Sequence, residues 1–140
     1  MKIFCTGASG YIGGSVAAAL MASGHHVRGL VRSAESAEKV RALGIEPVIG
    51  TLDDVAILAK EAKAADAVIN AASADHRGAA IALLDALAGS GKAFIHTSGS
   101  SIVGTRSAGQ RVDDVFDETT PFTPSPARAA RVALDKEILS

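Results

Sequence analysis

Short apolar segments alternate with longer segments of helical periodicity along most of the chain. The short segments are apolar almost throughout, which is typical of strands that are buried on both faces of a parallel sheet. Predicted strands cover residues 2–6, 26–31, 45–49, 66–71 and 93–97. Predicted helices cover residues 11–23, 34–43, 53–65, 76–88 and 127–139, and a long loop covers residues 105–126. This order predicts a doubly wound α/β fold, with a parallel sheet of about five strands in a three-layer αβα arrangement.

Composition and charge restrict the function class. The 140 residues suffice for one compact domain, and 48% of them are hydrophobic, which is enough to build a core. The net charge of −1 gives no electrostatic basis for binding nucleic acid, and no apolar run is long enough to cross a membrane. No charged-then-apolar leader follows Met1, so we expect a cytoplasmic protein with neither nucleic acid nor a membrane as its partner.

The one cysteine and the four histidines lack the spacing of metal ligands, so we expect no metal site. Cys5 lies in the first predicted strand and cannot form an internal disulfide, which favours a buried structural thiol over a reactive one. His96 lies in the fifth predicted strand and is interpreted as a hydrogen-bonded residue in or near the core.

Glycines at positions 7, 10 and 13 follow the first predicted strand and open the first predicted helix, and this placement indicates a phosphate site. Gly7 permits a tight turn, Gly10 lets the backbone approach a pyrophosphate, and Gly13 lets the helix pack closely on the sheet. The helix N-terminus then offers N–H groups and partial positive charge to the phosphates. The segment therefore predicts a dinucleotide site, and the alternative is a glycine turn without a ligand.

The spacing TGxxGxxG resembles that of the short-chain dehydrogenase/reductase superfamily, in the extended and atypical branches that include NAD-dependent epimerases and dehydratases. The resemblance covers the whole chain, with further similar segments at residues 24–27, 50–54, 70–72, 96–104 and 118–126. It implies a Rossmann-like NAD(P)-binding domain over residues 1–140. A doubly wound dinucleotide fold usually continues to a sixth strand, so the alternatives are a fragment, a truncated protein or an assembly in which a partner supplies the rest.

The resemblance also implies which residues contact the cofactor. In the glycine loop and the start of the helix they are Gly7, Ser9, Gly10, Tyr11, Ile12 and Gly13, and elsewhere they are Leu52, Ala71, Ala72 and Thr97. One position departs from the pattern, because Thr51 stands where the adenine motif of the superfamily usually has an aspartate.

The end of the second predicted strand bears on the choice of cofactor. NAD-binding members of the superfamily place an acid there to accept hydrogen bonds from the ribose hydroxyls, but this sequence has Val31 followed by Arg32. A guanidinium can hold a 2′-phosphate with two hydrogen bonds, whereas a carboxylate repels it. We therefore expect NADP rather than NAD, with a solvated surface charge as the alternative for Arg32. Arg28 lies upstream, and the direction of its side chain is open.

The residues at the positions that are catalytic in the superfamily differ more from its pattern. Redox-active members use a Tyr-x-x-x-Lys pair on the helix after the fifth strand, with a serine or threonine at the end of that strand. The only tyrosine here is Tyr11, so the standard pair is absent. Alignment on Glu118 and the prolines after it places Ala127 and Arg131 at the two positions, and a shift by one residue places Arg128 and Val132 there instead. The remaining weak catalytic candidates are Ser98, Ser100 and Arg131.

Three functional hypotheses follow. The first is an NADP-dependent oxidoreductase or epimerase of atypical short-chain type, which acts on an unknown small-molecule substrate. The second is a non-catalytic NADP-binding redox sensor or regulatory subunit, favoured by the missing catalytic residues. The third is a structural subunit with a vestigial glycine loop, favoured only by Thr51.

Two further features concern the substrate and a partner. Residues 75–77 are the best remaining polar cluster near a nicotinamide, with a helix cap as the alternative. A truncated sheet would leave apolar edges exposed, which favours a homo-oligomer. The resemblance to the superfamily implies that the helices at 76–88 and 127–139 form its surface.

Overall fold

The computed structural model describes residues 1–104 and 107–140. These residues form two compact units, Met1–Thr97 and Ser98–Ser140. Within the described ranges, no helix combines the length and the apolar character that crossing a bilayer would need.

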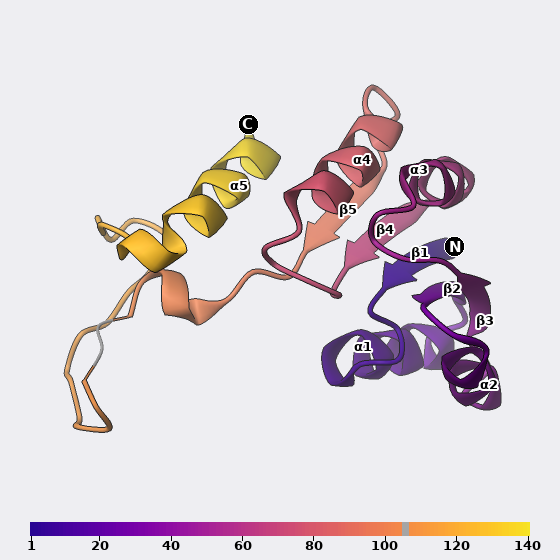
Figure 1. Ribbon diagram of the computed structural model, residues 1–140, viewed down its shortest axis with the longest axis horizontal. Coiled ribbons are helices and arrows are strands. Elements are labelled where there is room, and N and C mark those ends of the chain that lie inside the picture. Colours follow the sequence, from indigo (N-terminus) through magenta and orange to yellow (C-terminus); the bar gives the residue numbers. More distant parts are fainter. Residues whose placement is uncertain (105–106) are drawn as a thin grey trace. The chain divides into compact units, whose positions relative to one another are not determined.

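Five parallel strands form the centre of the first unit, in the order β3-β2-β1-β4-β5 (Figure 1). Their bounds are Lys2–Thr6 (β1), His26–Val31 (β2), Glu46–Ile49 (β3), Ala67–Asn70 (β4) and Ala93–His96 (β5). The chain adds β2 and β3 on one side of β1, then crosses to add β4 and β5 on the other side. The order in which the chain adds strands therefore reverses between β1 and β4, although the two strands are parallel. In doubly wound sheets, ligands bind beyond the carboxyl ends of the strands at such a point. The predicted doubly wound fold with about five strands is confirmed.

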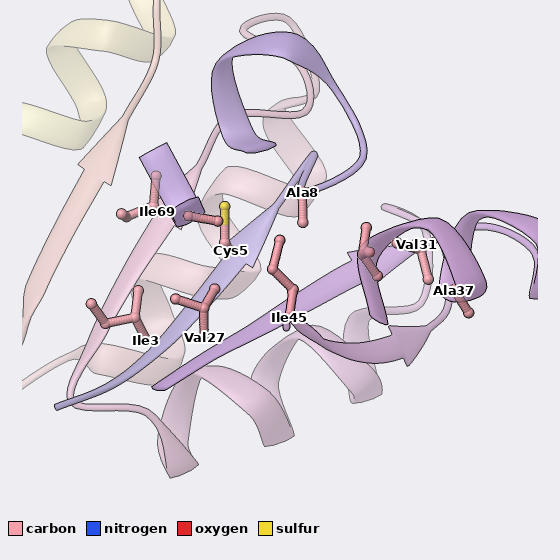
Figure 2. Close-up of a cluster of buried hydrophobic side chains, with 10 residues drawn as sticks. Ile3, Cys5, Ala8, Val27, Val31, Ala37, Ile45 and Ile69 are labelled. Carbon is pink, nitrogen blue, oxygen red and sulfur yellow. The ribbon is translucent and has the colours of Figure 1, made fainter. Parts of the chain in front are cut away.

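Helices cover both faces of this sheet. Their bounds are Tyr11–Ala22 (α1), Ala34–Ala42 (α2), Val55–Ala64 (α3) and Arg77–Leu87 (α4). The first pair lies on one face and the second pair on the other (Figure 1). Figure 2 shows the core on the side of α1 and α2, where Ile3, Cys5 and Val27 pack among other buried apolar side chains. A second core, around Phe4 and Leu83, fills the side of α3 and α4.

The observed bounds of β1 and β2 equal the predicted ones, and the other bounds differ by at most two residues. The start of α3 has a clear cause. The helix begins at Val55 rather than at residue 53, because the Thr51 N–H and hydroxyl donate to the Asp54 carboxylate at 2.6 and 2.8 Å. The hydrogen bond from the Thr51 N–H lowers the pKa of Asp54 below its ordinary value. A closed turn therefore precedes the helix.

The expectation that every strand is buried on both faces is wrong for the two strands at the edges of the sheet. In β3 only Val48 is fully buried, and Ile49 is exposed. In β5 exposed and half-buried residues alternate. Edge strands have a neighbour on one side only, so fewer side chains are covered.

The second unit is mostly irregular before its helix. It contains two short 3-10 helices, Ser100–Ile102 and Pro126–Arg128, and one α-helix, Ala129–Leu139 (α5). Residues 107–125 contain no helix or strand, as the predicted loop requires. Residues 105 and 106, also part of the predicted loop, lie outside the described residues. The predicted helix at 127–139 begins with a 3-10 turn, because Pro126 starts that turn.

Cys5 is expected to be unreactive in the folded chain. The residue has no exposed surface, and burial raises the pKa of its thiol from the ordinary 9.0 to about 11. A folded thiol of this kind stays protonated at pH 9, so an aromatic disulfide reagent should modify it only after denaturation. Because the pKa is higher in the folded state, stability should also fall as the pH rises from about 9 to about 11. Rapid modification of the native chain would contradict the buried position.

Candidate functional site

The glycine loop between β1 and α1 packs its backbone too tightly to admit side chains. Gly7 has a φ of +72°, a left-handed conformation that favours glycine. A Cβ atom on Gly7 would lie 2.7 Å from the Ala71 carbonyl oxygen. A Cβ atom on Gly13 would lie 2.3 Å from the Gly7 carbonyl oxygen. The loop therefore presents bare backbone at the carboxyl edge of the sheet, as the close approach of a pyrophosphate requires.

The first turn of α1 has N–H groups without intrahelical acceptors. The first intrahelical bond runs from the Gly14 N–H to the Gly10 carbonyl oxygen, at 2.9 Å. The N–H groups of Tyr11, Ile12 and Gly13 precede this bond. No side chain in the part of the chain that the structure describes caps the helix, and no acidic residue lies in its first turn. The glycine loop and this helix end together suit an anionic group.

A pocket of about 280 Å³ borders the loop. Its lining includes most of the predicted cofactor residues, namely Gly7, Ser9, Gly10, Arg32, Leu52, Ala71 and Ala72. Leu30, Val31 and Thr51 complete the lining and were not predicted. Their positions at the carboxyl ends of β2 and β3, next to predicted residues, could have identified them. The pocket has the bare backbone of the glycine loop on one part of its lining and apolar side chains such as Leu30 and Leu52 on another. These residues fit the adenosine end of a dinucleotide.

Four of the predicted contact residues do not line this pocket. The Tyr11 side chain is 92% exposed and Ile12 is half-exposed, both at the start of α1. Gly13 is buried against the loop. Thr97 follows β5 and donates its N–H to the Asn70 carbonyl oxygen at 2.9 Å. Contacts of these residues with a cofactor stay predictions.

Three polar side chains in register join the last residues of β1, β4 and β5. Thr6 Oγ1 accepts hydrogen bonds from the N–H groups of Ala71 and Ala72, at 3.2 and 3.3 Å, and donates to Asn70 Oδ1 at 2.6 Å. Asn70 therefore directs Nδ2 toward His96 Nδ1, at 3.0 Å. These bonds tie the pocket wall to β1. His96 is hydrogen-bonded as predicted at Nδ1, but its buried Nε2 has no partner among the described residues.

The two arginines near the second strand have separate surroundings. Arg32 lines the pocket, whereas Arg28 forms ion pairs nearer the amino end of β2. Arg28 donates from Nε and Nη2 to the Glu61 carboxylate at 2.7 and 3.2 Å, and from Nη1 to Glu46. The hydrogen bond to Glu61 raises the pKa of Arg28 above its ordinary value. Arg28 is thus a structural residue, and Arg32 is the cofactor candidate.

The candidate catalytic residues after β5 belong to the second unit, together with an acid that sequence reasoning missed. Ser98 donates from Oγ to Asp135 Oδ2 at 2.6 Å. Asp135 lies four residues after Arg131 on α5, so both side chains project from one side of the helix. That spacing could have identified Asp135. Arg131 Nη1 lies 3.5 Å from Ser101 Oγ, and the exposed Ser100 begins a 3-10 helix.

His76, from the predicted polar cluster at residues 75–77, contacts the loop after β3. Its Nδ1 accepts from the Ala79 N–H at 3.1 Å and so caps α4, which was the alternative interpretation of the cluster. Its Nε2 lies 3.2 Å from Asp53 Oδ1. The sequence placed this cluster near a nicotinamide, but capping turns the His76 ring toward the segment that contains Thr51 and Leu52.

Comparison with known proteins agrees with this arrangement. Residues 7–136 match the family described as NAD(P)H-binding. A 4-hydroxy-2-methyl-3-oxo-4-farnesyl-3,4-dihydroquinoline-1-oxide ketoreductase from Stigmatella aurantiaca is 45% identical over 73 residues, which are 52% of this chain and 22% of the ketoreductase. An oxidase from Acremonium sp is 40% identical over 131 residues, with 84% of this chain and 37% of the oxidase covered.

A solved structure shares the fold. UDP-glucose 4-epimerase from Bifidobacterium longum, in complex with NAD⁺ and UDP, has a TM-score of 0.78 at 18% identity and covers 99% of this chain and 48% of the epimerase. The chain spans between 22% and 38% of the length of the curated relatives that it matches. The family match supports a nicotinamide dinucleotide as the cofactor.

Proposed function

The chain belongs to the NAD(P)H-binding protein family, and we propose that it forms the dinucleotide-binding part of an NADP-dependent oxidoreductase or epimerase that acts on a small molecule. The pocket at the carboxyl edge of the sheet carries this proposal. Among the described residues that line it, Arg32 is the only charged one, and no carboxylate is present to repel a 2′-phosphate.

Different residues around the pocket would contact different parts of the cofactor. Bound there, a nicotinamide dinucleotide supplies a hydride donor or acceptor. The backbone at Gly7 and Gly10 and the N-terminus of α1 would hold the pyrophosphate. The Arg32 guanidinium would pair with the 2′-phosphate, and Leu52 would cover the adenine with apolar surface.

Redox chemistry at a carbon that bears oxygen is favoured by the relatives. The names of two curated relatives describe a ketoreductase, which acts on a carbonyl group, and an oxidase. Ser98, whose hydroxyl donates to Asp135, is the residue of this chain that we propose for proton exchange with a substrate oxygen.

One observation favours a second candidate, a dinucleotide-binding sensor without turnover. The single tyrosine of the chain, Tyr11, lies at the start of α1 rather than on α5. Incubation of the chain with NADPH and a panel of aldehydes and ketones separates the two functions. Oxidation of NADPH that depends on the carbonyl compound supports the enzyme, and saturable NADPH binding without oxidation on any member of the panel supports the sensor.

Arg32→Ala is expected to weaken NADPH binding about tenfold, which corresponds to ~1.4 kcal/mol, because the variant loses the cation beside the 2′-phosphate. NADH has no 2′-phosphate, so its dissociation constant should change less than about twofold. Calorimetric titration of both nucleotides measures the ratio. Arg41→Ala is the matched control, because Arg41 is an exposed arginine of the same unit that pairs with Glu38 on α2. Equal losses for the two nucleotides would remove the argument for NADP.

A further inference from the structure

We propose that Asp53 and His76 form a clasp that positions the adenosine end of the cofactor. The clasp is the hydrogen bond between these two side chains, and it joins the loop after β3 to the N-terminus of α4. This inference rests on the proposed function, because the pocket beside the clasp must hold a dinucleotide.

The hydrogen bonds of His76 determine which of its nitrogens carries the proton. Nδ1 accepts from the Ala79 N–H at 3.1 Å, so in the neutral ring the proton lies on Nε2. Nε2 therefore donates to Asp53 Oδ1, at 3.2 Å. Capping of α4 holds the His76 ring in this orientation. Its Nε2–H therefore points to Asp53 in the loop after β3.

The loop at residues 51–54 is linked internally, so a contact at one residue affects its neighbours. Thr51 donates twice to the Asp54 carboxylate, and the Asp53 N–H donates to Thr51 Oγ1 at 3.3 Å. Thr51 and the adjacent Leu52 line the pocket. The clasp thus acts on the pocket wall through a closed turn, although the Asp53 side chain itself is 88% exposed.

The other end of the clasp belongs to the segment after β4. Ala72, which lines the pocket, lies four residues before His76. The bond between Asp53 and His76 therefore links the two pocket-lining segments, one after β3 and one after β4, and we infer that it sets the spacing between them. An exposed pair adds little to folding stability, so its effect should appear in ligand affinity.

Two variants open the clasp and keep the rest of the site. Asp53→Ala removes both the charge and the oxygen that accepts from His76, and His76→Asn removes the Nε2 donor but retains a good helix-capping residue. Each variant should weaken binding of adenosine 2′,5′-bisphosphate about fivefold. Each should leave binding of nicotinamide mononucleotide unchanged. The double variant should lose no more than either single variant, because both changes break one bond.

The sign of the Asp53→Ala effect separates the clasp from simple electrostatics. Removal of a negative charge near an anionic ligand tightens binding if charge alone matters, whereas the clasp requires weaker binding. His26→Asn is the matched control. Its ring makes a similar 3.2 Å contact with Glu46, at the amino end of the sheet, and the change should leave both ligands unaffected.

The titrations, by calorimetry on the whole chain, have three decisive outcomes. Loss of affinity for the bisphosphate alone, in both clasp variants, supports the clasp. Unchanged or tighter binding of the bisphosphate in Asp53→Ala overturns the clasp and leaves the proposed function intact. Failure of the unaltered chain to bind the bisphosphate, NADPH and NADH overturns the proposed function and the clasp with it.

Discussion

Gly13→Ala is expected to lower the free energy of unfolding by about 3 kcal/mol and to weaken dinucleotide binding at least tenfold. The added Cβ would lie 2.3 Å from the Gly7 carbonyl oxygen, which belongs to the backbone and cannot turn away as a side chain would. Relief requires α1 to move away from the loop, and both the loop and the helix N-terminus contribute to the phosphate site. Chemical denaturation and NADPH titration measure the two effects.

Gly104→Ala provides the control for this prediction. Among the described residues, no atom lies within 4 Å of a Cβ placed at this position, and the backbone there has no left-handed φ. The change should therefore leave stability and nucleotide binding within error of the unaltered chain. If Gly13→Ala changes stability and nucleotide binding as little as Gly104→Ala does, the result would contradict the close contact between α1 and the glycine loop.

Arg28→Ala is expected to lower the free energy of unfolding by about 2 kcal/mol without changing the preference between NADPH and NADH. The Glu61 side chain is only 7% exposed and would lose the cation that neutralises it. The value is below that of a fully buried pair, because Arg28 is about one-third exposed and water screens part of the interaction. Urea denaturation gives the stability, and the nucleotide titrations give the preference.

Two comparisons test the cause of the Arg28 effect. The double variant with Arg28→Ala and Glu61→Ala should be more stable than Arg28→Ala alone, because no buried carboxylate is left without a partner. Arg41→Ala breaks an exposed pair with Glu38 and should cost at most about 0.5 kcal/mol. If Arg28→Ala instead reduces NADPH affinity selectively, Arg28 rather than Arg32 serves the 2′-phosphate.

Features that depend on local pattern could be predicted from the sequence. The order of strands and helices follows from apolar runs and helical spacing, and the pocket residues Gly7, Gly10 and Arg32 follow from glycine spacing and from the end of one strand. Cys5 was predicted to be buried from its place in the first strand, and it has no exposed surface.

Side-chain partners that are distant in sequence could not be predicted in this way. Arg28 and Glu61 are 33 positions apart, Asp53 and His76 are 23 apart, and Ser98 and Asp135 are 37 apart. Each pair depends on how two elements pack against each other. A single sequence, read alone, does not show which side chains such packing brings together. The contact between His76 and Asp53 could not be predicted for the same reason, whereas its capping of α4 is local and was the alternative interpretation.

Titration of the chain with NADPH and NADH by calorimetry tests the central claim most directly, namely that the pocket beside the glycine loop binds a nicotinamide dinucleotide through its adenosine end and Arg32. We expect saturable binding of both nucleotides with one site per chain, tighter for NADPH, and a preference that disappears in Arg32→Ala. Absence of binding by either nucleotide, or tighter binding of NADH by the unaltered chain, would contradict the account.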